Sequence, residues 1–283
     1  MKILLTGCAG FLGSHILDRL LADGHEVVGI DNLSTGSEEN MAHNKANKAF
    51  KFFKGDITDN DAIAHTMYGC DAVIHTAAIA RTPWTIDDPV LSHAVNATAT
   101  LQLLEWARRY KIKRFVHSSS CIVTAPFTPY YVSKLAAEEY CKIYPSLYGL
   151  SVIALRYQNL YGKRQSEKPP YPNVFAALRL AKKEHGKLFI TGDGEQTRDY
   201  THSSDAVEAN ILALHSDVIG AYDVCYGKST SLNEIAVFFD CPIEYIDERK
   251  GDIMHLIGDP KPAEEAFGFR AKVDVKDGIA DVL

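Results

Sequence analysis

The first thirty-one residues constrain the fold more than any other stretch of this chain. The run Ile3–Leu5 contains no polar residue, which is typical of a parallel strand buried on both faces. Gly7, Gly10 and Gly13 follow at intervals of three, then an amphipathic segment that ends at Gly24, then a second apolar run that ends at an acid. We therefore predict strand, glycine turn, helix and strand in this order.

This arrangement predicts a dinucleotide site. Glycines without Cβ atoms allow backbone N–H groups and the positive end of a helix to approach a pyrophosphate. Asp31 ends the second strand, where its carboxylate would accept hydrogen bonds from two ribose hydroxyls and repel a 2′-phosphate. A flexible loop would explain the glycines alone, but the surrounding order favours binding of NAD over NADP. The predicted contacts here are Gly7, Gly10, Phe11, Leu12, Gly13, Asp31, Asn32, Ser34, Thr35 and Gly36.

Further apolar runs alternate with helical patterns and predict an α/β fold. The runs are Phe50–Phe53, Ala72–His75, Phe115–His117 and Ser151–Leu155. This alternation predicts a doubly wound parallel sheet of the Rossmann type, which binds ligands at the carboxyl ends of its strands. At or near those ends we expect Asp56, Ile57, Thr76, Ala77, Ala78, Ala80 and Ser118 to contact NAD, and Asn96 to act from the following long helix. We interpret His75 as a core histidine rather than a ligand.

The composition changes after Gly162. The stretch Lys163–Pro172 is rich in proline and charge, which is typical of a border between domains. We predict an NAD-binding domain over residues 1–165 and a small α/β substrate lobe over residues 166–283, part of which packs back on the first domain. No internal repeat is found.

Charge and cysteine content exclude several classes of function. The net charge of -6 shows no basic excess, so nucleic acid and anionic membrane surfaces are not expected partners. The six cysteines lack the paired spacing of a metal site or a disulfide framework, and we expect no metal and a reducing, cytoplasmic location. No stretch is apolar for long enough to span a membrane.

Tyr130 and Lys134 are the strongest candidates for chemistry. Their spacing of four places both side chains on one face of a helix. A positive Lys134 and an oxidised nicotinamide would favour the phenolate, and moving a tyrosine pKa from about 10 to near 7 takes roughly 4 kcal/mol. The chain has 14 tyrosines, so this spacing also arises by chance. The prediction therefore depends on position, one helix after Ser118–Ser120.

These motifs together resemble the extended short-chain dehydrogenases/reductases, in particular the NAD-dependent sugar-nucleotide epimerases and dehydratases. The similarity covers nearly the whole chain, and UDP-glucose (UDP-galactose) 4-epimerases have the closest pattern. It includes the glycine turn, Asp31–Leu33, Asp56–Ile57, the serine run, Tyr130 with Lys134, Arg156–Asn159, Gly192–Tyr200 and Arg249–Ile253.

The resemblance implies a role for each motif. Ser120, Tyr130 and Lys134 would form the catalytic triad. Asn159, Arg198, Arg249 and Asp252 would bind the nucleotide diphosphate of a UDP-sugar, and Tyr157 and Gln158 would lie near the nicotinamide. The implied reaction is epimerisation at C4 through a 4-keto sugar. The implied assembly is a homodimer that pairs helices 94–110 and 131–144 of each subunit.

Three departures from the family pattern keep alternatives open. The loop Cys121–Pro129 is much shorter than usual, Gln158 replaces an aromatic residue, and Leu256 is of intermediate size where family members vary beside the sugar's C2 substituent. Dehydratases place an acid and a base after the triad's serine or threonine, where this chain has Cys121 and Ile122. A sugar-nucleotide dehydratase and a catalytically silent NAD-binding regulator remain the alternatives.

Overall fold

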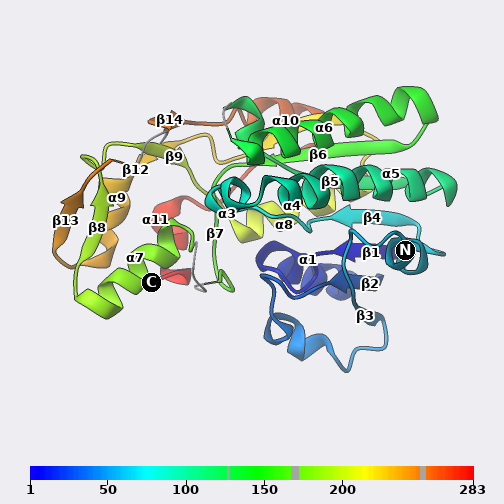
Figure 1. The fold of residues 1–283 in the computed structure, drawn as a ribbon, viewed down its shortest axis with the longest axis horizontal. Coiled ribbons are helices and arrows are strands. Elements are labelled where there is room, and N and C mark those ends of the chain that lie inside the picture. Colours follow the sequence, from blue (N-terminus) through cyan, green and yellow to red (C-terminus); the bar gives the residue numbers. More distant parts are fainter. Residues whose placement is uncertain (126–127, 167–171, 249–252) are drawn as a thin grey trace.

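A seven-stranded parallel sheet forms the centre of the molecule. The structure is a computed structural model that describes residues 1–125, 128–166, 172–248 and 253–283. The sheet has the strand order β11-β6-β5-β4-β1-β2-β3, with helices on both faces (Figure 1). The prediction of an α/β, doubly wound parallel sheet is confirmed. The strands are β1 Lys2–Thr6, β2 Glu26–Asp31, β3 Phe50–Lys54, β4 Ala72–His75, β5 Arg114–Ser120, β6 Ser151–Tyr157 and β11 Gly220–Val224.

Each face of the sheet is covered by its own helices. Ile3 and Leu5 of β1 pack into a core with α1 (Phe11–Ala22) and α8 (Ser203–His215). Leu4 belongs to a second core with α2 (Asn60–Met67), α5 (Ala99–Arg109) and α6 (Pro129–Tyr148). The first strand is therefore buried on both faces, as its apolar run predicts. His75 is also a core residue, because Thr6 and Thr100 hydrogen-bond its two ring nitrogens at 2.7 and 2.9 Å.

The long helix that we expected to carry Asn96 is interrupted. Helix α3 (Thr82–Asp87) comes first, and Asp88 then caps α4 (Pro89–His93) by accepting from Leu91 N at 2.9 Å. A π-helical stretch, Ala94–Thr98, separates α4 from α5. It contains the buried Asn96, whose amide contacts the segment after β4. The wider π-helical turn therefore lies where Asn96 makes a polar contact near the carboxyl ends of the sheet strands.

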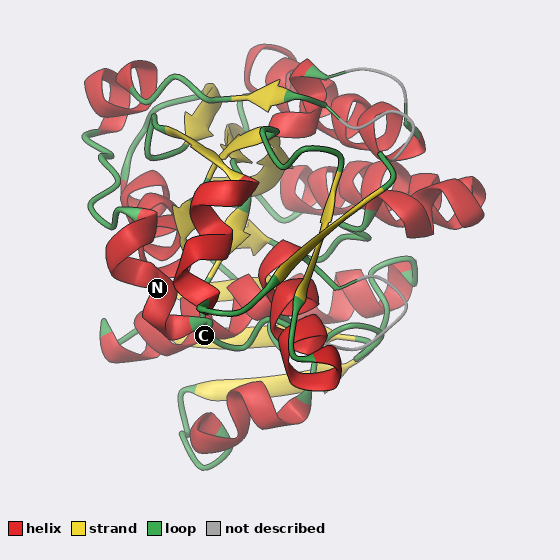
Figure 2. Ribbon diagram, turned by 90° about the vertical axis from the view of Figure 1, so that its left-hand side faces the viewer, coloured by secondary structure: helices red, strands yellow, loops and turns green. Residues whose placement is uncertain are grey.

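The second half of the chain contributes both to the sheet and to a separate α/β lobe. Strand β11 pairs in parallel with β6, and α8 covers one face of the sheet. The lobe lies beside the sheet and faces the viewer in Figure 2. Its elements are α7 (Val174–His185), β8 (Leu188–Thr191), β9 (Thr197–Asp199), β12 (Ser229–Ser231), α9 (Leu232–Ala236), β13 (Ile243–Ile246) and β14 (His255–Leu256). The second half also contains β7 (Leu160–Tyr161), β10 (Thr201–His202), α10 (Lys261–Phe267) and α11 (Val275–Gly278). None of the helices within the described ranges is both long and apolar enough to cross a membrane.

Candidate active site

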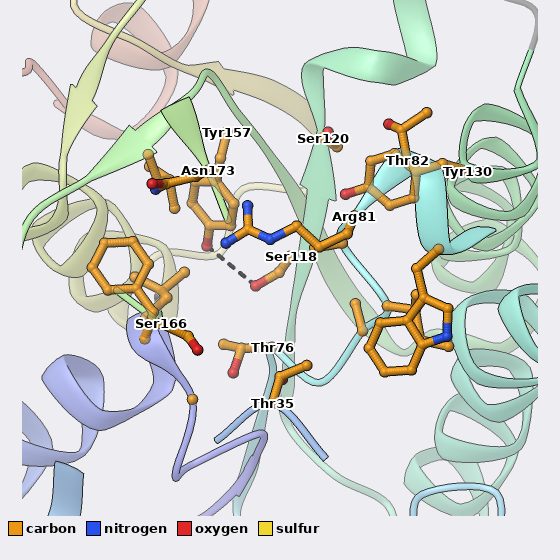
Figure 3. Close-up of a pocket in the computed structure, with 18 of the residues that line it drawn as sticks. Thr35, Thr76, Arg81, Thr82, Ser118, Ser120, Tyr130, Tyr157, Ser166 and Asn173 are labelled. Carbon is orange, nitrogen blue, oxygen red and sulfur yellow. Dashed lines mark hydrogen bonds between the residues drawn. The ribbon is translucent and has the colours of Figure 1, made fainter. Parts of the chain in front are cut away.

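A large cleft runs along the carboxyl ends of the sheet strands and reaches the lobe. Its volume is about 1850 Å³. Residues of the β1–α1 turn, β2, the segment after β4, β5 and β6 line one side, and residues of α7, β9 and α9 line the other. Figure 3 shows polar side chains from both sides pointing into this space.

The glycine turn forms the floor of the cleft. Gly7 has φ +70°, and a Cβ there would lie 2.8 Å from the backbone nitrogen of Ala77. A Cβ on Gly13 would lie 2.0 Å from the carbonyl oxygen of Gly7. Gly10 precedes α1 without a side-chain cap, so no side chain occupies the positive end of the helix. The turn therefore has the shape and polarity that a pyrophosphate requires, and it fits NAD.

Asp31 lies at the end of the cleft that suits the adenosine. Its Oδ2 accepts from Ala9 N at 2.9 Å and its Oδ1 from Leu33 N at 2.8 Å, which leaves lone pairs on both oxygens for ribose hydroxyls. Burial raises the pKa of Asp31, and the backbone donors oppose that rise. Asn32 lines the same end of the cleft and donates a hydrogen bond to Asp56 Oδ2 at 2.7 Å. Ser34, Thr35, Ile57, Thr76, Ala77, Ala78 and Ala80 also line the cleft.

Three residues predicted to contact the cofactor do not line the cleft. Gly36 packs against the backbone of Ala9, where a Cβ would lie 2.8 Å from the carbonyl carbon. Gln158 is 2% exposed, and its Nε2 lies against Gly258, 2.9 Å from where a Cβ on that glycine would be. Asn96 instead holds the wall of the cleft, because its side chain accepts from Ile79 N at 2.8 Å and donates to Ile79 O at 3.0 Å. Local sequence does not specify which backbone or side chain each of these residues packs against.

Ser120, Tyr130 and Lys134 meet in the cleft at the end of β5 and the start of α6. Burial raises the pKa of Tyr130 to about 12, and Ser120 and Arg81 act to lower it. Lys134 was expected to play that part, but its ammonium donates to the Ser118 carbonyl at 2.5 Å. Burial lowers the pKa of Lys134 to about 8. The tyrosine is therefore protonated until a positive charge or a substrate contact favours its phenolate.

Glu138 fixes α6 against the two strands that carry site residues. This fully buried carboxylate accepts from Ser119 Oγ at 2.6 Å, from Arg156 Nε at 2.9 Å and from Lys142 Nζ at 2.9 Å. Burial opposes its charge, yet these donors lower the pKa of Glu138 to about 2. Glu138 follows Lys134 by four residues, which places the two side chains on the same face of α6. Sequence reasoning did not use this spacing to identify Glu138.

The lobe side of the cleft contains cations and amides. Arg198 lines it and donates to Thr197 O at 2.8 Å, while Asn159 donates to Asp199 O at 3.1 Å. Asn173 caps α7 by accepting from Ala176 N at 2.8 Å and also lines the cleft. Arg249 and Asp252 lie outside the described residues. Ser118 and Tyr157 line the cleft, and the lining residues that sequence reasoning missed include Arg81, Trp84, Arg164, Asn173 and Arg179.

This fold and this site define a class. A parallel sheet with a glycine turn after β1, and with serine, tyrosine and lysine at the end of β5 and on the next helix, is the arrangement of the extended short-chain dehydrogenases/reductases. Residues 3–225 match the NAD dependent epimerase/dehydratase family, and the chain belongs to that family. It is an NAD-dependent α/β protein.

Known relatives include both reaction types. The UDP-glucose 4-epimerase of Mycolicibacterium smegmatis is 33% identical and aligns with 100% of this chain and 97% of its own. The UDP-N-acetylglucosamine 4-epimerase of Methanobrevibacter ruminantium, in complex with UDP-N-acetylmuramic acid, has a TM-score of 0.94 at 32% identity, over 99% of this chain and 96% of that one. The dTDP-glucose 4,6-dehydratase DesIV of Streptomyces venezuelae, with NAD bound, has a TM-score of 0.91 at 27% identity, over 100% and 95%. The comparisons therefore support an enzyme of the epimerase/dehydratase kind.

Proposed function

We propose that this protein is a 4-epimerase of a UDP-sugar, acting through a transient 4-keto sugar. Bound NAD supplies the group that accepts hydride from C4 and later returns it to the other face. Ser120 and Tyr130 are the side chains that would contact the C4 hydroxyl, and Tyr130 would take its proton. Lys134, held by Ser118, would lie near the nicotinamide ribose, and Arg198 and Asn159 would bind the diphosphate.

The residues after Ser120 favour epimerisation over dehydration. Loss of water from a 4-keto sugar needs an acid and a base beside the triad. Ile122 carries no titratable group, and burial raises the pKa of the Cys121 thiol to about 11. Cys121 is therefore a protonated thiol at neutral pH and a poor base. The chemistry of these two side chains is the observation that carries the choice of epimerase.

Incubating the NAD-loaded protein with UDP-sugars separates the candidate functions. An epimerase gives an isomer of unchanged mass without net NADH, a dehydratase gives a product lighter by one water, and a regulator gives neither. The test should include UDP-glucose, UDP-galactose, their acetamido forms and UDP-glucuronic acid. We expect an isomer, and product mass spectrometry with NMR would reveal a water-loss product that contradicts the proposal.

Variants of two tyrosines on α6 test the assigned base. Tyr130→Phe should lower turnover by roughly 10²–10⁴, the usual range for a general base. Tyr140→Phe is the matched control, because Tyr140 is 38% exposed on the same helix and does not line the cleft. Wild-type turnover in Tyr130→Phe would contradict the assignment of Tyr130 as the base.

We also propose that the protein is a homodimer. The exposed apolar side chains that support it lie on α6, one of the two helices expected to pair, and on α4 rather than on residues 94–110. Helices α4 and α6 carry a group of exposed apolar side chains, which a second copy of the chain would cover. The group consists of Val90, Leu91, Val132, Tyr140, Ile143, Leu147 and Tyr148, of which Val90 is 79% exposed. Light scattering at micromolar concentration should give the mass of two chains. Val132→Glu should reduce that mass, whereas Ile219→Glu, at an exposed site in the loop before β11, should not.

A further inference from the structure

We infer that Arg81 is a specificity residue that binds a carboxylate attached to the sugar ring next to C4, as in a hexuronic acid. This inference rests on the proposed function, because that function puts C4 of the sugar beside Tyr130. It adds a substrate class: UDP-sugars that carry a carboxylate at C6.

The backbone of Arg81 is held firmly at the edge of the cleft. Asn96 binds both backbone groups of Ile79, two residues earlier. The carbonyl of Arg81 accepts from Thr85 N at 3.1 Å in the first turn of α3. From this fixed wall the side chain extends into the cleft between Tyr130 and Tyr157 (Figure 3). The backbone position from which the guanidinium extends is therefore set by the fold.

The Arg81 guanidinium has no hydrogen-bond or ion-pair partner among the described residues. Other cations that line the cleft are bound by the protein: Lys134 by the Ser118 carbonyl, Arg164 by Asp18 at 2.8 Å, and Arg198 by the Thr197 carbonyl. Burial lowers the pKa of Arg81, and Tyr130 is the titratable group that it senses. A partly desolvated fork of five donors without an acceptor suits a carboxylate or a phosphate, either of which it can bind with two parallel hydrogen bonds.

The surrounding charges favour the sugar over either phosphate group. The pyrophosphate of NAD has its own cradle at the glycine turn. The substrate diphosphate is assigned to Arg198, which acts electrostatically on Cys121. Arg81 acts on Tyr130 and is not among the charges that affect Cys121. Arg81 lies beside Tyr130 in the cleft (Figure 3), so a sugar with C4 at Tyr130 would have the ring substituents next to C4 within reach of Arg81.

No described carboxylate competes for this position. The acidic residues that line the cleft within the described ranges are Asp31, Glu39 and Asp56, all grouped at the end assigned to the adenosine. Carbon C6 is attached to C5, the direct neighbour of C4, so a C6 carboxylate would be the negative group nearest to Tyr130. A neutral hydroxymethyl group at C6 would leave the guanidinium without an anion.

The test measures the affinity of the NAD-loaded protein for UDP, UDP-glucose and UDP-glucuronic acid by calorimetry. Wild-type protein should bind UDP-glucuronic acid more tightly than UDP-glucose by roughly 10- to 100-fold, the range expected for a charge-assisted hydrogen bond in a partly buried site. Arg81→Met should remove this advantage while changing the affinities for UDP, UDP-glucose and NAD by less than about threefold. Arg81→Lys, which keeps the charge but loses the fork, should be intermediate. Arg270→Met, at a side chain that is 76% exposed, is the matched control and should change nothing.

Each other outcome refutes the inference in a recognisable way. Equal losses for all three UDP ligands in Arg81→Met would mean that Arg81 binds the diphosphate. A loss of NAD affinity would assign Arg81 to the cofactor. Equal binding of the two sugars by the wild-type protein would exclude a carboxylate site even if Arg81→Met failed to fold. Because the measurement is of binding, it is independent of the reaction: Arg81-dependent binding without an isomer would overturn the proposed function alone, whereas isomer formation with no Arg81-dependent preference would overturn this inference alone.

Discussion

Removing the charge of Glu138 should destabilise the protein more than removing the charge of the next residue along α6. Both carboxylates bind Lys142, Glu138 at 2.9 Å and Glu139 at 2.7 Å. Glu138 is fully buried and also binds Ser119 and Arg156, whereas the Glu139 side chain is 55% exposed. Glu138→Gln and Glu139→Gln therefore form a matched pair that differs mainly in burial and in the number of donors.

The size of the effect follows from the pKa of Glu138. Lowering the pKa of Glu138 from 4.5 to about 2 corresponds to about 3 kcal/mol of folding free energy, because each pKa unit is worth about 1.36 kcal/mol. Two of the donors, Arg156 and Lys142, are partly exposed, so we reduce the expected loss in Glu138→Gln to about 2 kcal/mol. Glu139→Gln should cost about 0–1 kcal/mol, as exposed ion pairs do. Urea unfolding of both variants at pH 7 gives the two free energies of unfolding.

The pH dependence of the free energy of unfolding tests whether the charge of Glu138 causes this stabilisation. The folded-state pKa of Glu138 lies below the value in the unfolded chain, so its contribution is complete above about pH 4.5 and is lost as the pH falls toward 2. The difference in stability between wild type and Glu138→Gln should therefore shrink between pH 5 and pH 3. A difference that stays constant over that range, or equal losses in the two variants at pH 7, would show that the charge of Glu138 does not hold α6 in place.

Three further predictions concern the cleft. Asp31→Asn should narrow the preference for NADH over NADPH in fluorescence titrations, because it removes the charge that repels a 2′-phosphate; equal affinity of the wild type for both would refute the role of Asp31. Gly13→Ala should lower NADH affinity at least 10-fold, since its Cβ would lie 2.0 Å from Gly7 O, and unchanged affinity would show that the turn can rearrange. Turnover should rise with pH as Tyr130 loses its proton, and Ser120→Ala should move that rise to higher pH, because Ser120 lowers the pKa of Tyr130; a pH profile that does not move would refute this coupling.

The local sequence pattern was sufficient to predict the first half of the fold. The β1 run, its glycine turn and Asp31 are specified by neighbours in sequence, since each depends on burial and backbone geometry within about thirty residues. The position of Tyr130 and Lys134 could be predicted for the same reason, because one strand and one helix bring them to the cleft. Prediction succeeded where the periodicity of a single element decides the outcome.

Features that depend on distant contacts were missed or misplaced. Gly220–Val224 is a short segment that becomes a sheet strand only because β6 offers a free edge. Asn96 and Gln158 are polar residues whose direction depends on which backbone lies nearby, Ile79 in one case and Gly258 in the other. Arg81 belongs to no periodic pattern, and only the structure shows that it faces the cleft with no partner among the described residues.

The place of β11 in the sheet affects how this chain can fold during synthesis. Strand β6 is complete at Tyr157, but its outer neighbour is not made until Val224. A nascent chain at that stage exposes the unpaired N–H and C=O groups of β6, which are a template for pairing with other chains. At about 5–20 residues per second, the ribosome leaves this edge open for several seconds. A chaperone that shields the edge of β6 during that interval would therefore raise the yield of folded protein more than one that acts after release.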